Sequence, residues 1–581
     1  MTRSRWKLMS TALASSLMVT AVLAGCSGNN ENNGTPSPSA SQPSESTSAA
    51  PSESASAAAP TPDLTPITYT INTGDDKMNW TNPIAAKVTE KTGVSLKHTL
   101  TVGDQFSRWD LWLASNDYPD IVVLDSEYTK KYRDAGALIP LNDLIDQYGP
   151  HIKEKFGKYL NLLKDENGQI YSLYSVNKTE EATPDSQANF IIQYDVLKEA
   201  GYPEVKTFDQ LYDLIKGYTD KHPEIDGKDT IGFGALMNSW TMKIAFNNSV
   251  INGSGLPDHG NYRIEDNGDV KYNPVTDDTK QYYAFLNKLL RAGLFDKEAF
   301  SMDEKAFQAK VAQGRVLAAY SPSWLLSDAE QSLRAAGHPE RTYAHIPLYF
   351  DANVVDHSNS ITATNAGNFQ WGISKKAKNP ERIIQFIDYL FTDEAQVLTQ
   401  WGIEGEDYTV VDGKRVINPE LVKQRITDSN IDYERGFKTI STGGSGYWFS
   451  IGNGAKLADG DYATPLTKDV IKAGYDDTTK EVLAKYGKEV WADFLPPATI
   501  VPGYLWQLSP PDATKVQEQK IDDSWRKHIP RIILSKDDAS FEKAWSAFVA
   551  EIEKDGLQDV NAAYTKLWAD FDSKFKAAVG E

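Results

Sequence analysis

The chain has 581 residues, of which 40% are apolar and 11% aromatic, so it can build a large core and is not globally disordered. Its formal net charge of −20 argues against a general nucleic-acid binder and against a peripheral binder of anionic lipid. A single cysteine leaves no intramolecular disulfide and no cysteine-based zinc site.

Residues 1–25 have the pattern of an export signal. Basic residues precede an uncharged apolar run from Leu8 to Leu23, which is short for a membrane-spanning helix. The run ends in Leu23-Ala24-Gly25-Cys26, which resembles the lipobox of bacterial lipoproteins. That resemblance implies cleavage after residue 25 and a diacylglyceryl group on Cys26, and two acyl chains suffice for stable anchoring. The alternative is a plain signal peptide with a chance cysteine.

Residues 26–62 predict a disordered tether. Serine, alanine, proline, asparagine and threonine dominate this stretch, and it has almost no large apolar side chains to bury. A flexible chain of this length reaches on the order of 30–35 Å. We therefore expect a globular, extracytoplasmic body that begins near residue 66 and is held at the outer face of the cell membrane.

The body alternates predicted strands and helices. The first elements are a strand at 66–71, a helix at 83–92 ended by Gly93, and a strand at 94–101. Asp104 can cap the next helix, whose apolar side chains recur at helical spacing. The wholly apolar Ile121–Leu124 is typical of a buried parallel strand. This βαβ alternation predicts an α/β fold.

Later segments continue the pattern. Strands are predicted at 231–237 and 316–320, and helices at 278–290 and 380–391. The second helix has Asn379 at its cap position and Pro380 in its first turn, which is a well-formed start signal. Its isoleucines, with Leu390 and Phe391, predict a buried face.

Five segments, in the right order, resemble signature stretches of one protein family. Residues 108–122 (RWDLWLASNDYPDIV) are similar to its LASGD.PDI signature and residues 132–144 (YRDAGALIPLNDL) to its GL..PL.DLI segment. The other three segments are 170–173 (IYSL), 375–391 (KKAKNPERIIQFIDYLF) and 402–408 (GIEGEDY), with Tyr174 in place of a usual proline. On these residues the chain resembles family 1 extracellular solute-binding proteins, the substrate-binding lipoproteins of ABC importers, in their long Paenibacillus/Bacillus-type branch.

The resemblance implies the type II periplasmic-binding-protein-like fold, in which hinge strands join two α/β lobes, here with a helical C-terminal region. One lobe would hold residues 66–180 plus 371–440, and the other 186–365 plus 441–581. The ligand would lie between the lobes, since ligand sites favour such inter-domain clefts. Closure of the lobes around a ligand requires that the closed state bind it more tightly.

Candidate ligand residues lie in loops that follow predicted strands, because such loops line the ligand crevice of α/β sheets. These loops pair aromatic with polar side chains, and sugar recognition needs a flat apolar ring together with hydroxyl-binding groups. The candidates are Trp80, Asp125, Glu127, Trp240, Trp324 and Trp448, the last in the Gly-rich turn 443–448. The alternative for each tryptophan is core packing. For the two acids it is capping of a helix that begins near Ser126.

A calcium site is a further hypothesis from the resemblance. Members of this branch often carry a calcium loop before a strand of the second lobe. The equivalent acids are Asp220, Glu224, Asp226 and Asp229, whose oxygens could serve as ligands. Pro223 and the spacing depart from the family pattern, and a solvated acidic turn is the alternative. We expect no other cofactor.

Three functions follow from these features. The leading hypothesis is a lipid-anchored, monomeric receptor that binds a plant-polysaccharide-derived oligosaccharide and delivers it to the permease of an ABC importer without catalysis. The alternative is a secreted carbohydrate-active hydrolase, which would need two carboxylates about 5–5.5 or 6.5–9.5 Å apart. Glu127, Glu404 and Glu406 are candidate acids for it. A sensor subunit that feeds a membrane kinase is the third.

Overall fold

The computed structural model describes residues 64–178, 186, 188–238, 241–246, 256–257, 261–351, 354, 359–362, 369–441 and 447–580. The predicted export signal, Cys26 and the tether lie outside the described residues, as does Trp240. The described residues belong to one compact unit. In the described ranges, no helix combines the length and the apolar character needed to cross a bilayer.

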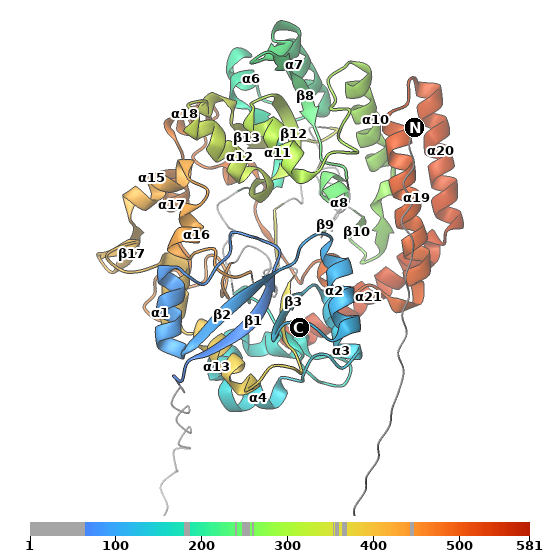
Figure 1. Ribbon diagram of the computed structural model, residues 1–581. Coiled ribbons are helices and arrows are strands. Elements are labelled where there is room, and N and C mark those ends of the chain that lie inside the picture. The colour runs from blue at the N-terminus through green and yellow to red at the C-terminus, as the bar shows by residue number, and fades with distance from the viewer. Residues whose placement is uncertain are drawn as a thin grey trace, which may run out of the picture. The chain divides into compact units, whose positions relative to one another are not determined.

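The first lobe is built on a five-stranded mixed sheet (Figure 1). Its strands in spatial order are β2 (Val94–Leu100), β1 (Ile67–Thr73), β3 (Ile121–Leu124), β15 (Gln370–Ile373) and β4 (Ser172–Leu173). β1 is parallel to β2 and β3, whereas β15 is antiparallel to β3 and β4. The parallel β1–β2 pair needs a crossover, and α1 (Pro83–Thr92) supplies it. Gly93 ends α1 as predicted, with a left-handed φ of 69°.

The core of this lobe lies where helices meet the sheet. The accompanying elements are α2 (Gln105–Ser115), α3 (Ser126–Asp134), α4 (Asn142–Tyr148), α5 (Pro150–Phe156), η1 (Gly157–Leu163), α13 (Pro380–Leu390) and α14 (Asp393–Gln396). The predicted isoleucine face of α13 is buried against Ile121 and Trp371 of the sheet. Asn379 does not cap α13 with its side chain within the described chain, because it adopts a φ of 50°. Instead, its carbonyl accepts a hydrogen bond from the Tyr69 hydroxyl at 2.9 Å.

A lateral group of elements extends this lobe. It consists of the π-helical turn η4 (Val397–Trp401), the hairpin β16 (Tyr408–Val411) and β17 (Lys414–Ile417), α15 (Pro419–Thr427) and α16 (Ile431–Arg435). The next described residues, as far as Ala463, return to the first lobe's core. Phe449, for example, packs against Trp371 with ring centroids 5.0 Å apart. The packing therefore places residues 447–463 with the first lobe, whereas the sequence prediction assigned everything after 440 to the second.

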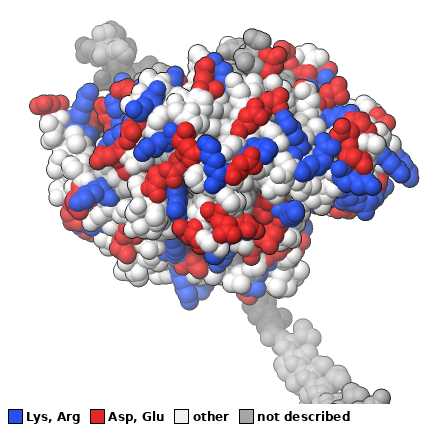
Figure 2. Space-filling model, turned by 90° about the horizontal axis from the view of Figure 1, so that it is seen from above, with Lys and Arg blue, Asp and Glu red and all other residues white. Residues whose placement is uncertain are grey.

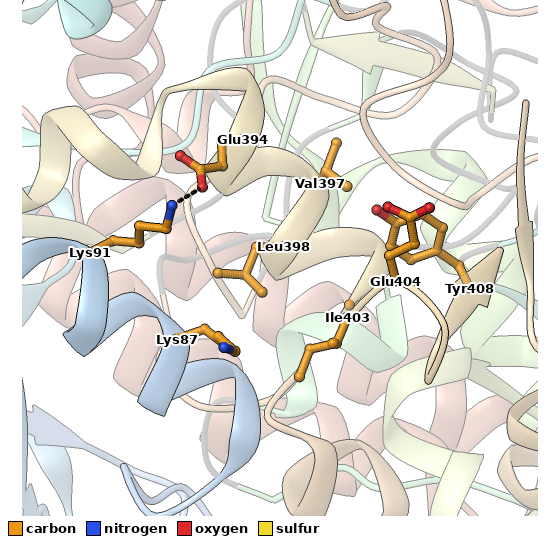
Figure 3. Close-up of a pocket in the computed structure, with 9 residues that line it drawn as sticks. Lys87, Lys91, Glu394, Val397, Leu398, Ile403, Glu404 and Tyr408 are labelled. Carbon is orange, nitrogen blue, oxygen red and sulfur yellow. Dashed lines mark ion pairs between the residues drawn. The ribbon is translucent and has the colours of Figure 1, made fainter. Parts of the chain in front are cut away.

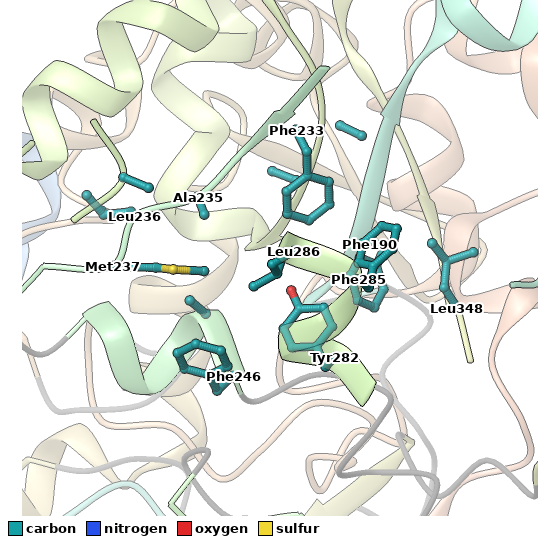
Figure 4. Packing of buried hydrophobic residues seen from close by; sticks show 14 of the residues in the cluster. Phe190, Phe233, Ala235, Leu236, Met237, Phe246, Tyr282, Phe285, Leu286 and Leu348 are labelled. Carbon is teal, nitrogen blue, oxygen red and sulfur yellow. The ribbon is translucent and has the colours of Figure 1, made fainter. Parts of the chain in front are cut away.

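The second lobe is built on a four-stranded sheet. Its strands in spatial order are β13 (Tyr343–Ile346), β5 (Ala188–Gln193), β12 (Val316–Pro322) and β8 (Ile231–Gly234). β12 is parallel to β8 and antiparallel to β5. The accompanying helices are α6 (Tyr194–Glu199), α7 (Phe208–Lys221), α8 (Thr241–Phe246), α10 (Asp277–Arg291), α11 (Glu304–Ala312) and α12 (Ser323–Ala335). Phe190 and Phe233 of the sheet pack with Phe285 of α10 in its core (Figure 4).

Smaller elements complete the fold. The short strands are β6 (Glu224–Ile225), β7 (Lys228–Asp229), β9 (Leu256–Pro257), β10 (Tyr262–Ile264), β11 (Val270–Tyr272), β14 (Ser360–Thr362) and β18 (Thr499–Val501). The remaining helical elements before the C-terminal group are η2 (Asn273–Val275), η3 (Pro339–Arg341), α17 (Lys468–Ala473), α18 (Asp477–Lys485), η5 (Trp491–Phe494), η6 (Leu505–Gln507) and η7 (Asp512–Thr514). β14 pairs in parallel with β18 and so ties the later part of the chain to the stretch before β15.

The last three helices are long, which confirms the predicted helical C-terminal region. They are α19 (Lys515–Ile533), α20 (Asp538–Lys554) and α21 (Leu557–Val579), and they share one colour in Figure 1. Asn287 of α10 donates to the carbonyl of Ile533 at 2.8 Å, which fastens α19 to the second lobe. The chain is thus a two-lobed α/β protein with a helical C-terminal group.

Candidate ligand-binding site

Side-chain hydrogen bonds hold the end of β1 and the loop that follows it in place. The Asn72 amide donates to the Val123 carbonyl at 2.9 Å, and its oxygen accepts from the Val123 N–H at 2.7 Å. The Asp75 carboxylate accepts from the backbone N–H of Lys77 at 2.9 Å and thereby closes a tight local turn. The other Asp75 oxygen accepts from the hydroxyl of Tyr433 at 2.6 Å. Residues 358 positions apart in the sequence therefore meet beside this loop.

Two tyrosines and two lysines gather around Asp75. The Nζ atoms of Lys77 and Lys438 each lie 5.3 Å from the ring centroid of Tyr433. Lys438 Nζ is also 5.2 Å from the ring of Tyr447. Burial, followed by the hydrogen bond to Asp75, raises the pKa of Tyr433. Burial also raises the pKa of Tyr447, so both hydroxyls stay protonated at neutral pH and can donate hydrogen bonds. We call Asp75, Lys77, Tyr433, Lys438 and Tyr447 the tyrosine–lysine cluster.

Helix α12 of the second lobe presents one face to this cluster. Asp328 Oδ2 lies 3.3 Å from Lys77 Nζ, and Gln331 donates to the carbonyl of Arg425 at 2.8 Å. Trp324 is four residues before Asp328, so it lies on the same side of the helix, one turn away. Trp324 is 55% exposed, which is unusual for so large an apolar side chain. An accessible indole on the second lobe thus lies one helical turn from the residue that pairs with the tyrosine–lysine cluster of the first lobe.

The predicted acids after β3 have structural partners. Asp125 caps α3, because its carboxylate accepts from the backbone N–H of Tyr128 at 2.8 Å. Burial raises the pKa of Asp125 from 3.8 to about 6. Glu127 forms an ion pair with Lys515 at the start of α19, with an Nζ–Oε1 distance of 2.6 Å. Asp125 therefore acts as a helix cap, which was the alternative to ligand binding, and Glu127 links the first lobe to the C-terminal helices.

Trp448 and Trp80 are packed together in the first lobe. Trp448 is 1% exposed, and its indole N–H donates to the carbonyl of Gly436 at 2.8 Å. The two tryptophan rings lie 5.7 Å apart, and the Trp80 indole N–H donates to the Thr89 hydroxyl at 2.9 Å. These contacts match the core-packing alternative for both residues. Of the predicted tryptophans in the described chain, Trp324 alone is largely exposed.

Sequence reasoning missed Tyr433, Lys438 and Tyr447. They come from α16 and from the segments after it, which follow no strand of either sheet. For Tyr447 a signal did exist, because it is the neighbour of Trp448 in the predicted aromatic turn. The structure turns Trp448 into the core and leaves Tyr447 beside Lys438. For the other two residues, no local pattern in the sequence indicates the contact with Asp75.

Comparison with known proteins places the chain in a family. The family described as bacterial extracellular solute-binding protein matches residues 76–397, which is more than half of the chain. The chain belongs to this family. Its two-lobed fold is also that of the alginate-binding protein AlgQ2, with a TM-score of 0.61 at 18% identity over 87% of this chain and 98% of the other. FusA of Streptococcus pneumoniae in complex with kestose gives the same TM-score at 18% identity, over 87% and 100% of the two chains.

Two curated relatives match this solute-binding protein over only part of their length. The fructooligosaccharide ABC transporter substrate-binding protein FusA of Streptococcus pneumoniae is 25% identical over 342 residues, which are 56% of this chain and 60% of FusA. The polygalacturonan/rhamnogalacturonan-binding protein YtcQ of Bacillus subtilis is 23% identical over 326 residues, 54% of this chain and 61% of YtcQ. The match thus spans about three fifths of the length of these relatives.

A separate pocket of about 340 Å³ lies on the first lobe of this solute-binding protein, between α1 and the loop after η4 (Figure 3). Its lining includes Val397, Leu398, Ile403 and Glu404, and Lys91 of α1 pairs with Glu394 at its rim at 2.6 Å. The five predicted ligand residues that the structure describes, Trp80, Asp125, Glu127, Trp324 and Trp448, are not among those that line it.

The GIEGEDY segment builds one wall of that pocket. Asp407 is buried and accepts hydrogen bonds from the backbone N–H of Ile403 at 2.8 Å and from Arg435 at 2.7 Å. Gly402 has a φ of 95°, and a Cβ there would lie 2.5 Å from Asp407, so glycine is required. Glu406 pairs with Arg435 at 2.9 Å. The motif is therefore explained by the fold of this loop.

The predicted calcium ligands do not fit a metal ion. Asp220 pairs with Lys216 at 2.7 Å, and Asp226 pairs with Arg341 at 2.6 Å. Glu224 and Asp229 are exposed on the β6–β7 hairpin, which turns through Asp226. Over the described residues, no three His, Cys, Asp or Glu side chains are arranged to hold a metal. Cations of the protein itself neutralise two of the four carboxylates, so this segment matches the acidic-turn alternative.

Proposed function

We propose that this solute-binding protein is a receptor that holds an oligosaccharide between its lobes and delivers it to an ABC importer without breaking bonds. The supporting observation is that Trp324 lies one helical turn from Asp328, which pairs with Lys77 of the tyrosine–lysine cluster across the two lobes. An exposed indole offers the flat apolar face that a pyranose ring packs on, while hydroxyl, carboxylate and ammonium groups suit sugar hydroxyls. The names of the relatives FusA and YtcQ, which bind fructooligosaccharide and polygalacturonan or rhamnogalacturonan, support a carbohydrate ligand.

Closure of the lobes would transmit ligand occupancy. Asp328 and Lys77 belong to different lobes, so a ligand that contacts both sides favours the closed arrangement. A permease could then recognise the closed surface in preference to the open one. We propose that the protein acts as a monomer in this cycle.

The hydrolase alternative has less support among the described residues. Two of the three candidate acids, Glu127 and Glu406, are each held in an ion pair with a basic side chain. Glu404 lies at the separate pocket of the first lobe. The family consists of solute-binding proteins, which favours capture over bond cleavage.

Incubation of the purified protein with defined plant oligosaccharides tests the proposal. A receptor gives a ligand-dependent rise in melting temperature, because ligand binds the native state only, and leaves the sugar intact on chromatography. Shortened sugars in the reaction would support the hydrolase instead. The absence of any thermal shift or calorimetric heat across the panel would refute a carbohydrate receptor.

We also propose that Cys26 anchors the protein. The lipobox resemblance supports thioether-linked diacylglycerol at this residue, and residues 26–62 would then hold the body near the outer face of the membrane. An anchored receptor stays close to its permease, which raises the local concentration of loaded receptor.

A further inference from the structure

The tyrosine–lysine cluster contains a cation that lacks a carboxylate partner. Asp75 accepts from the Tyr433 hydroxyl at 2.6 Å, and Asp328 accepts from Lys77 at 3.3 Å. The nearby Asp432 is paired with Arg425 at 2.7 Å. Across the described residues, the side chain of Lys438 forms no ion pair, and its contacts are the rings of Tyr433 and Tyr447. The three neighbouring carboxylates are thus engaged, while the ammonium group of Lys438 remains available.

The ion pair between Lys77 and Asp328 can also be replaced at a small cost in free energy. The pair is solvent-exposed, with 38% and 50% of the two side chains accessible. Exposed pairs of this kind contribute about 0–1 kcal/mol. An incoming anion can therefore replace Asp328 at Lys77, and Lys438 lies beside the same Tyr433 ring. The Nζ atoms of both lysines are at the same distance, 5.3 Å, from the centroid of that ring.

The aromatic side chain of Trp324 indicates which kind of anion this site would bind. Trp324 lies one helical turn from Asp328 and is 55% exposed, so a ring that packs on it lies next to Lys77. A uronate residue combines a pyranose C–H face with a carboxylate on the same ring. Aromatic stacking and a charge-assisted hydrogen bond to lysine would then be satisfied by one sugar unit.

We infer that this site selects acidic, uronate-containing oligosaccharides, and that Lys438 is the residue that distinguishes them from neutral ones. The inference rests on the proposed function. The formal net charge of the chain is −20, and on the face seen in Figure 2 acidic and basic side chains are interspersed. Attraction of an acidic sugar therefore has to arise locally, from Lys438 and Lys77, and not from the field of the whole protein.

Calorimetry with matched trisaccharides tests the inference. The probes are trigalacturonate, triglucuronate, trimannuronate and triguluronate, each paired with the same trisaccharide after reduction of its carboxylates to alcohols. We expect at least one acid to bind more tightly than its reduced form by about tenfold or more, the value for a hydrogen bond to a charged group. That difference should shrink as salt rises from about 0.01 M to about 1 M, where the screening length falls to about 3 Å.

Lys438→Met keeps the length of the side chain and removes its charge. In this variant the preference for the acid should disappear, because the affinity for the acid falls more than the affinity for the reduced trisaccharide. Lys423→Met is the matched control, because Lys423 is 77% exposed on α15 and lies outside the cluster. Its acid preference should equal that of the wild type, and thermal unfolding of both variants checks that they fold.

The outcomes separate the two proposals. If reduced trisaccharides bind as well as the acids, or if Lys438→Met retains the acid preference, the selection by Lys438 is wrong and a receptor for neutral sugars remains. If neutral and acidic sugars all fail to bind the wild-type protein, the proposed function itself is wrong.

Discussion

The ring of Tyr159 in the first lobe stacks on the ring of Phe575 in α21, with centroids 6.1 Å apart and planes inclined by 14°. Earlier in the same helix, Tyr564 stacks on Tyr262 of the second lobe, with centroids 4.1 Å apart. The last helix of the chain is therefore fastened to both lobes. It forms a further connection between them, far in sequence from the Lys77–Asp328 pair.

Replacement of Phe575 by alanine should loosen one end of α21. We expect the free energy of unfolding to fall by about 1 kcal/mol, the value typical of an aromatic pair, because both rings are only half-buried. Hydrogen exchange should rise in the last turns of α21 and stay unchanged near Tyr564. Lys574→Ala, at an exposed neighbouring position, is the control. Equal stability of the two variants would show that the stack contributes nothing.

Asp125→Asn should change how stability depends on pH. Burial raises the pKa of Asp125 to about 6 in the folded protein, above its ordinary value of 3.8. The folded state therefore binds more protons between those pH values, and stability falls as the pH rises through about 6. Asparagine caps a helix as well as aspartate does, so the variant should be more stable than the wild type at pH 7.

The same variant should match the wild type near pH 4, where the wild-type carboxyl is largely protonated in the folded state. Thermal unfolding at several pH values measures the difference between the two proteins. A wild-type advantage at pH 7 would mean that the charge of Asp125 stabilises the cap more than burial destabilises it.

Trp324→Ala and Trp448→Ala should have opposite effects. Trp324 is 55% exposed, so its loss should leave the melting temperature nearly unchanged but weaken oligosaccharide binding by about tenfold or more. Trp448 is 1% exposed in the core of the first lobe, and its loss should cost about 3–5 kcal/mol of stability. Calorimetry and denaturant titration separate the two effects. Normal binding by the Trp324 variant would remove this residue from the site.

Cys26→Ser should release the protein from membranes. The predicted diacylglyceryl group requires the cysteine thiol, and a serine hydroxyl does not replace it. Wild-type protein from cells should partition into the detergent phase of Triton X-114, whereas the variant should remain in the aqueous phase. Metabolic labelling with radioactive palmitate should mark only the wild type. Partition of both proteins into the aqueous phase would contradict the lipid anchor.

Local sequence signals predicted much of the first lobe. The helix α1 begins at Pro83 and ends at Gly93 because proline and glycine impose local backbone geometry that tertiary contacts do not override here. At α13 the start and the cap position were also predicted correctly, but among the described residues Asn379 makes no capping hydrogen bond with its side chain. Asn379 takes a left-handed φ of 50° while its carbonyl binds the Tyr69 hydroxyl, a contact across 310 positions that no local pattern contains.

The candidate site was predictable only where it follows strands. Loop position placed Trp324 and Asp125 near the ends of strands, but it could not tell an exposed tryptophan from a buried one. Trp448 was predicted as a ligand residue but lies in the core, where its ring is buried and packs against the ring of Trp80. The Tyr433–Asp75 hydrogen bond joins two segments that only the folded chain brings together.

Helix α21 has 23 residues and hence a length of about 35 Å. Its ring contacts with the second lobe, at Tyr564, and with the first lobe, at Phe575, lie 11 residues apart, or about 16 Å along the helix axis. A change in the angle between the lobes therefore has to shift or break one of these two contacts. We expect opening of the lobes to act on the Phe575 contact first, since it is the looser of the two.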